Sequence, residues 1–312
     1  MHTKSFPLFF FLLLLTACTS SVNHWKQAQL EWAQKDYLGA IIELNTCLRN
    51  KQESDSIYLL RARCYQQIQN DSFAANDYHK ALQLNPRLGE AKLELGRLQL
   101  RANDTTSACK AFRELLHSQP ARITSDAWIE LGRNAYFSDQ FPRAIVSMNK
   151  AVQSDSSNHM AWYYRGLLYS RFFTPEGETR PAYYPFLDMP RAIHDFSESI
   201  RLQSDFADAW YQRAMVHFNQ FDQAQGMRDI NEAIRLEPHY SYYYSARAHQ
   251  LLVAGKDQAA LNDYNQAISL NAQDPEAYLG RAEVFIKLGK KEPALADRVK
   301  ASQLDKRLMI GQ

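Results

Sequence analysis

Two series of alanines and glycines recur along this 312-residue chain at a nearly constant spacing. The first series is Ala28, Ala62, Gly96, Gly132, Gly166, Ala214, Ala248 and Ala282. The second series is Ala40, Ala74, Ala108, Ala144, Ala192, Gly226, Ala260 and Ala294. In each series five of the seven intervals are 34 residues, a period that is typical of repeat architectures. Because small residues let two backbones approach closely, each pair of positions predicts two tightly packed helices.

Larger residues recur in the same register and are seen most completely in one segment. It reads Tyr58, Arg61, Ala62, Tyr65, Ala74, Tyr78, Ala81 and Pro86. This pattern resembles the tetratricopeptide repeat, a 34-residue helix–turn–helix unit. In its register the chain divides into units 21–54, 55–88, 89–122, 125–158, 159–206, 207–240, 241–274 and 275–308. The resemblance implies an all-α fold, a right-handed α-solenoid of about eight units over residues 21–308, with a tail at 309–312.

The fourth position of six predicted units is aromatic: Tyr58, Trp128, Trp162, Trp210, Tyr244 and Tyr278. No unit can bury its apolar face alone, so stacked units share one continuous core. We therefore expect most of the aromatic and aliphatic side chains to fill the core.

An arginine at the seventh position and an aspartate at the twenty-third occur together in five units. The pairs are Arg61 with Asp77, Arg165 with Asp195, Arg213 with Asp229, Arg247 with Asp263, and Arg281 with Asp297. These positions lie in the first and the second helix of a unit, where the two side chains can meet. Arginine has a planar fork that suits a partly buried bidentate pair. We predict five structural ion pairs rather than ligand-binding residues.

Residues 1–17 have the pattern of a targeting segment. Lys4 precedes an apolar run from Phe6 to Leu15, which is too short to span a bilayer. The run ends in Leu15-Thr16-Ala17-Cys18, which resembles the lipobox of bacterial lipoproteins. The resemblance implies removal of residues 1–17, lipidation of Cys18 and a short tether at 18–20. The alternative is an ordinary signal peptide cut after Ala17. The residues after Cys18 favour an outer-membrane location facing the periplasm.

The composition and the absence of known motifs do not favour other classes of function. Without residues 1–17 the chain has 35 basic and 34 acidic residues, so its net charge of +1 does not favour nucleic acid. No phosphate-binding loop, dinucleotide fingerprint, zinc motif or nucleophile elbow is present in the sequence. The sequence therefore predicts no catalytic residues, no metal and no cofactor. Cys47, Cys64 and Cys109 fall on packing positions, and we expect small buried side chains there.

The family resemblance places certain first-helix positions on a concave face that binds partners. We predict a groove made of Arg97, Arg101, Arg133, Tyr136, Phe137, Tyr163, Arg171, Tyr211, Met215, Phe218 and Tyr242. Aromatic residues, methionine and arginine are enriched at interface hot spots. Such a groove would suit an extended or helical peptide. The alternative is that neighbouring units bury several of these side chains.

The fifth unit contains 14 extra residues, at about 172–190, between its two helices. Four prolines exclude a continuous helix there. The segment also carries Tyr183, Tyr184 and Phe186, which either pack on the repeats or contact a partner.

These features favour a non-catalytic adaptor that is anchored to the bacterial envelope and binds envelope proteins or peptides. The alternative is a permanent structural or assembly subunit of a secretion, pilus or cell-wall machine. No separate helix is predicted after residue 308, so a second copy of the chain is also a candidate partner.

Overall fold

The computed structural model describes residues 23–117, 119–170 and 188–305, and every regular element in this part is an α-helix. The helices are α1 (His24–Ala33), α2 (Tyr37–Arg49), α3 (Asp55–Gln67), α4 (Asp71–Leu84), α5 (Gly89–Arg101), α6 (Thr105–Glu114), α7 (Ala121–Phe137), α8 (Phe141–Ser154), α9 (His159–Ser170), α10 (Met189–Leu202), α11 (Ala207–Asn219), α12 (Gln223–Leu236), α13 (Ser241–Val253), α14 (Asp257–Leu270), α15 (Pro275–Lys287) and α16 (Lys291–Leu304). The all-α fold class is confirmed.

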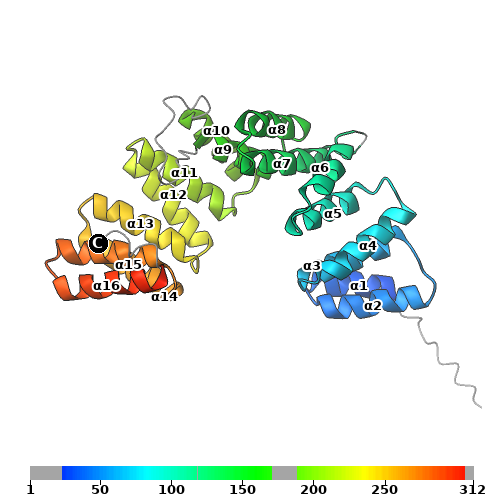
Figure 1. Ribbon diagram of the computed structural model, residues 1–312, viewed down its shortest axis with the longest axis horizontal. Helices are drawn as coiled ribbons and strands as arrows, with labels where there is room; N and C mark the ends of the chain where they lie inside the picture. The colour runs from blue at the N-terminus through cyan, green and yellow to red at the C-terminus, as the bar shows by residue number, and fades with distance from the viewer. Residues whose placement is uncertain (1–22, 118, 171–187, 306–312) are drawn as a thin grey trace, which may run out of the picture. The chain divides into compact units, whose positions relative to one another are not determined.

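The helices belong to two compact bodies, divided between Asp104 and Thr105. The N-terminal body contains α1 to α5, and the C-terminal body contains α6 to α16 (Figure 1). Within each body, successive helices pack as hairpins, such as α3 with α4 and α11 with α12. Each hairpin packs in turn against the next, as α10 does against α11. Each body is therefore a stack of helical hairpins.

In seven of the eight predicted units the small residues lie where the two helices of a hairpin meet, and all sixteen are buried. Gly166 of α9 illustrates why no larger side chain fits. A Cβ added to it would lie 2.9 Å from a ring carbon of Phe196 in α10. The close approach predicted from the two series is thus present, and it lets large rings such as Phe196 fill the space between helices.

The turns inside the hairpins share one backbone conformation. Their central residue has a positive φ at Lys35, Gln69, Asn103, Asp139, Phe221, Gly255 and Gly289. The next residue donates its N–H to a carbonyl five residues earlier, as Asp222 does to His217 at 2.9 Å. This bond satisfies a carbonyl at the end of the first helix. Only two of these seven residues are glycine, so five turns carry the strain of a side chain in the left-handed region.

Two helix boundaries and the grouping of one pair of helices differ from the predicted units. Helix α7 begins at Ala121, directly after Pro120, whereas the fourth unit was predicted to begin at 125. Helix α10 begins at Met189 and is capped by Asp188, so the last two residues assigned to the insertion are helical. Proline is tolerated in a first helical turn because the N–H it lacks has no partner there. The two helices of the predicted unit 89–122 belong to different bodies, α5 to the first and α6 to the second.

Several predictions lie outside the described residues. They are the targeting segment 1–17, Cys18 and the tether 18–20, Arg171, the insertion residues Tyr183, Tyr184 and Phe186, and the tail 309–312. Among the helices that are described, none combines the length and the apolar character needed to cross a bilayer.

Candidate functional site

The five predicted Arg–Asp pairs all form, with the same geometry. In each, Nε and Nη2 of the arginine donate to the two carboxylate oxygens at 2.6–2.9 Å. The aspartates are buried, and the arginines reach them across each hairpin. Hydrogen bonds to Asp263 and Asp297 hold the pKa of Arg247 and Arg281 above its ordinary value. These guanidinium groups are occupied by structural contacts.

Each of these arginines has a third partner that was not predicted from the sequence. Nη1 donates to a side chain 16 residues earlier, on the last helix of the preceding hairpin. The acceptors are Asn45, Asn149, Ser197, Asn231 and Asn265. Each guanidinium also lies 4.8–5.7 Å from the ring centre of the fourth-position aromatic. These acceptors could have been predicted from the sequence, because each lies 16 residues before its arginine. These arginines therefore join neighbouring hairpins as well as the two helices of one hairpin.

Three residues of the predicted groove are core residues, which corrects that part of the prediction. Tyr163, Tyr211 and Phe218 are only 8%, 7% and 5% exposed. The next hairpin covers each tyrosine: the Tyr163 ring packs on Phe206 at 4.8 Å, and that of Tyr211 stacks on Tyr243 at 5.2 Å. The alternative of burial by neighbouring units holds for the two tyrosines, whereas Phe218 packs on Gly226 of α12 within its own hairpin.

The other predicted groove residues that the structure describes are divided between the two bodies. Arg97 and Arg101 lie in the N-terminal body, where Arg97 pairs with Glu94 at 2.6 Å and Arg101 donates two hydrogen bonds to Asp71. In the C-terminal body Met215 is half-buried, whereas Tyr242 is exposed. Only Arg133, Tyr136 and Phe137 come together in one concave site.

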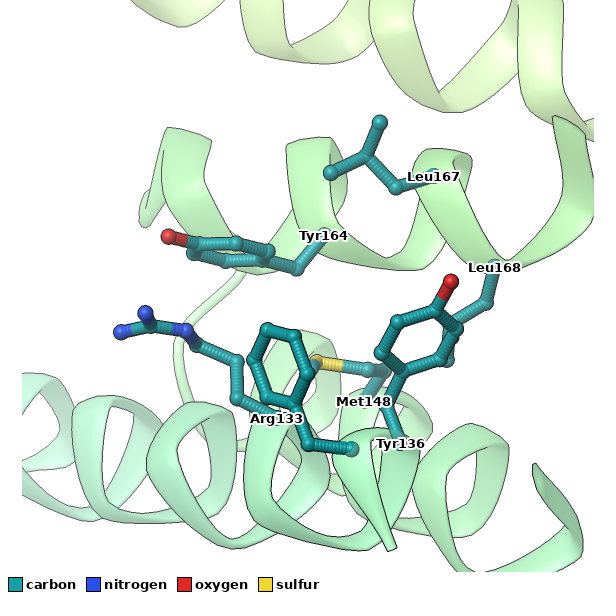
Figure 2. Close-up of a pocket in the computed structure, with 7 residues that line it drawn as sticks. Arg133, Tyr136, Met148, Tyr164, Leu167 and Leu168 are labelled. Carbon is teal, nitrogen blue, oxygen red and sulfur yellow. The ribbon is translucent and has the colours of Figure 1, made fainter. Parts of the chain in front are cut away.

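This site is an apolar pocket of about 120 Å³ between α7, α8 and α9, called here the α7–α9 pocket. Figure 2 shows Arg133 and Tyr136 facing Tyr164, Leu167 and Leu168 across it. Phe137 and Met148 complete the lining. The lining residues Met148, Tyr164, Leu167 and Leu168 were not among the predicted site residues.

The walls of the α7–α9 pocket are held by local contacts. The Arg133 guanidinium lies 5.2 Å from the ring centre of Tyr164 and 3.1 Å from a carboxylate oxygen of Glu130. The Tyr136 ring meets Phe141 edge-on, with ring centres 5.5 Å apart. Phe137, in contrast, is 77% exposed at the end of α7. The pocket thus combines a fixed apolar wall with one aromatic side chain presented to solvent.

Among the described residues, no three His, Cys, Asp or Glu side chains gather in a way that could hold a metal ion. Cys47, Cys64 and Cys109 are buried and form no disulfide with one another. Burial raises the pKa of all three thiols, that of Cys64 to about 12.

Parts of the chain are similar in sequence to known tetratricopeptide repeats. Models of the tetratricopeptide repeat match residues 74–123 and 207–240, and a model described as TPR repeat matches 248–289. Human tetratricopeptide repeat protein 16 is 30% identical over 102 residues, which are 33% of this chain and 11% of that protein. The chain therefore spans about a tenth of the relative's length.

Solved structures share the fold at low identity. A structure of the APC/C hetero-tetramer Cut9–Hcn1 superposes with a TM-score of 0.63 and 14% identity, over 92% of this chain and 55% of that one. A tetratricopeptide repeat protein from Parabacteroides merdae gives a TM-score of 0.55 and 17% identity, over 82% and 97% of the two chains. At these identities the similarity establishes the α-solenoid fold alone.

Proposed function

Because the chain belongs to the tetratricopeptide repeat family, we propose that it is a non-catalytic scaffold, anchored to the bacterial envelope, that binds partner proteins or peptides through the α7–α9 pocket. The observation that carries the proposal is the pocket itself. It is concave and apolar, and Phe137 stands exposed beside it. Exposed aromatic residues next to an apolar pocket are typical of interface hot spots.

The size of the α7–α9 pocket indicates what it takes. An apolar cavity of about 150 Å³ holds benzene, so the smaller volume of about 120 Å³ suits a single aliphatic side chain such as leucine. Arg133 at the rim is already paired with Glu130, and it serves to orient Tyr164 rather than to supply a free charge. The expected ligand is therefore an apolar side chain projecting from a peptide segment.

Anchoring of the scaffold rests on the sequence around Cys18. The apolar run followed by Leu15-Thr16-Ala17-Cys18 supports lipidation of Cys18 and an outer-membrane location facing the periplasm. Helix α1 begins at His24, six residues after Cys18. A tether of that length reaches at most about 20 Å. A partner bound to the repeats would thus be held near the membrane.

The pocket is tested by site-specific photo-crosslinking in cells. A benzophenone amino acid is placed at Phe137 and, as the matched control, at Phe221, an exposed phenylalanine in a turn outside the pocket. We expect defined envelope proteins to crosslink at Phe137 and not at Phe221. Identical patterns at the two sites would refute the pocket as the binding site. A fixed stoichiometric set of proteins at both sites would favour the permanent-subunit alternative.

Anchoring is tested by feeding cells a labelled fatty acid and comparing the wild type with Cys18→Ala and Cys109→Ala. We expect label in the wild type and in Cys109→Ala, because Cys109 is buried, and none in Cys18→Ala. Label that persists in Cys18→Ala would exclude lipidation at this cysteine.

A further inference from the structure

A second hollow lies on the C-terminal body, and it sits where the Arg–Asp network is interrupted. It is lined by residues of α6, α7 and α8 and has a volume of about 560 Å³; we call it the α6–α8 hollow. In the repeat register Leu131 stands in place of the network arginine and Ser147 in place of the aspartate. Arg113 stands in place of the asparagine or serine that accepts from the arginine elsewhere. The α6–α8 hollow therefore lacks the aspartate that neutralises an arginine at the same place in other hairpins.

The lining of the α6–α8 hollow is apolar with cationic edges. Leu116, Leu131 and Val146 provide apolar surface, and Arg113 and Arg143 are both exposed. None of the described residues that line it is acidic. Arg143 donates to the neutral amide oxygen of Gln140 at 2.7 Å, and Arg113 forms no ion pair with the described residues. Two positive charges thus flank an apolar surface without a carboxylate.

A similar hollow in the N-terminal body provides a contrast. It is lined by Ile42, Asn45, Leu48, Arg49 and Arg61. There the Arg61 guanidinium is neutralised by the buried carboxylate of Asp77 and also donates to Asn45. The neighbouring Arg49 donates to Thr46 Oγ1 at 2.8 Å and has no carboxylate partner among the described residues, so this hollow holds one arginine without a counter-charge where the α6–α8 hollow holds two.

We propose that the α6–α8 hollow docks an acidic peptide segment of a partner protein, with an apolar side chain between Leu131 and Val146 and carboxylates on Arg113 and Arg143. Its volume lies within the range of about 300–1,000 Å³ that is usual for ligand sites. Guanidinium groups bind carboxylates through strong charge-assisted hydrogen bonds. A neutral or basic segment would instead cover the two arginines without compensating their charge.

The site is separate from the α7–α9 pocket. Arg133, Tyr136 and Phe137 of α7 line that pocket, whereas Leu131 and Ala135 line the hollow. At about 100° per residue the two sets lie on opposite faces of α7. The inference rests on the proposed scaffold function and adds the chemistry of a second ligand that can bind at the same time.

The test measures fluorescence anisotropy of a labelled peptide in which glutamates flank two leucines, added to the full-length chain. The same peptide with glutamine in place of glutamate is the charge control. We expect tighter binding of the glutamate peptide, weakened by salt. Arg113→Gln and Arg143→Gln should each lower its affinity about tenfold. Arg228→Gln is the matched control, because Arg228 is also exposed and donates only to a glutamine, and it should bind as the wild type does.

A second variant closes the hollow without removing structure. Arg113→Asn, Leu131→Arg and Ser147→Asp together install the network present in the other hairpins, so this chain should fold normally and lose the glutamate peptide. Equal binding of the two peptides, or unchanged binding by the arginine variants, would overturn the inference. So would dimerisation of the free chain that requires Arg113 while the peptide does not bind, because a second copy would then be the occupant.

The two proposals fail separately. Phe137→Ala should leave binding of the glutamate peptide unchanged. If the glutamate peptide binds but no specific crosslinks form at Phe137, only the proposal for the α7–α9 pocket is refuted. If specific crosslinks form at Phe137 but the glutamate peptide does not bind, only the proposal for the α6–α8 hollow is refuted.

Discussion

The Arg213–Asp229 pair offers the sharpest test of how the hairpins are joined. Asp229 of α12 is only 3% exposed and accepts from Nε and Nη2 of Arg213 at 2.7 and 2.8 Å. Asp229→Asn keeps the shape of the side chain but removes its charge and one acceptor. The Arg213 guanidinium then stays partly buried without a counter-charge, and its remaining partners are the one oxygen left at position 229, Ser197 at 2.9 Å and the Trp210 ring. The cost therefore comes from electrostatics and not from a cavity.

The magnitude follows from the degree of burial. Breaking a fully buried pair by removing one partner costs about 3–5 kcal/mol. The Arg213 side chain is 18% exposed and retains these three contacts, so we expect about 2–3 kcal/mol for Asp229→Asn. For a body of this size such a loss lowers Tm by about 4–12 °C.

The same helix provides the control. Glu232 of α12 pairs with Arg235 at 2.6 Å, but the Arg235 side chain is 66% exposed and that of Glu232 30% exposed. Exposed pairs contribute little to stability, so Glu232→Gln should leave the urea midpoint unchanged within error. Both variants are compared by urea and thermal unfolding followed by circular dichroism. Equal effects of the two substitutions would refute the argument that burial, and not the ion pair as such, sets the cost.

Four further outcomes are expected. Phe218→Ala should cost about 3–5 kcal/mol in urea unfolding, because the ring is 5% exposed and packs on Gly226 of α12. Phe221→Gly should stabilise by about 1 kcal/mol in the same assay by relieving a positive φ, and a loss would contradict this. Burial, with the charge of Arg122 adding to it, lowers the pKa of His159 from near 6.5. The folded chain thus favours the neutral ring, so the free energy of unfolding should be constant above pH 6.5 and fall below it. Unfolding midpoints measured from pH 7.5 to about 5.5 should fall less in His159→Asn than in the wild type. Cys64, with its pKa raised to about 12, should resist alkylation at about pH 8 until the chain unfolds, and rapid labelling of the native chain would contradict its burial.

The repeat architecture could be predicted because its determinants are periodic. Small residues such as Ala62 and Ala74 are required wherever two helices touch, and the requirement returns with every hairpin. The Arg–Asp pairs were predictable for the same reason, since both partners occupy fixed positions of the repeat register within one unit. Their asparagine or serine acceptors were overlooked because they belong to the preceding unit.

The candidate site could be predicted only in part. Periodicity identifies the helix on which a residue lies, but the exposure of that residue depends on what the next hairpin places over it. Tyr163 and Tyr211 occupy predicted groove positions, yet Phe206 and Tyr243 cover them. Phe137 remains exposed, and beside it Tyr164 and Leu168 of α9 line the pocket.

The sequence alone determined that this chain is a series of helical hairpins with shared small residues and repeated ion pairs, because those requirements are local to one unit and recur. Only the tertiary structure showed where the side chains of those units leave a pocket or a hollow. The α7–α9 pocket depends on side chains from three helices, and the α6–α8 hollow on Leu131 and Ser147 replacing a bridging pair. It also placed α5 and α6 of one predicted unit in different bodies. Binding surfaces depend on contacts between units, and a pattern within one unit does not contain them.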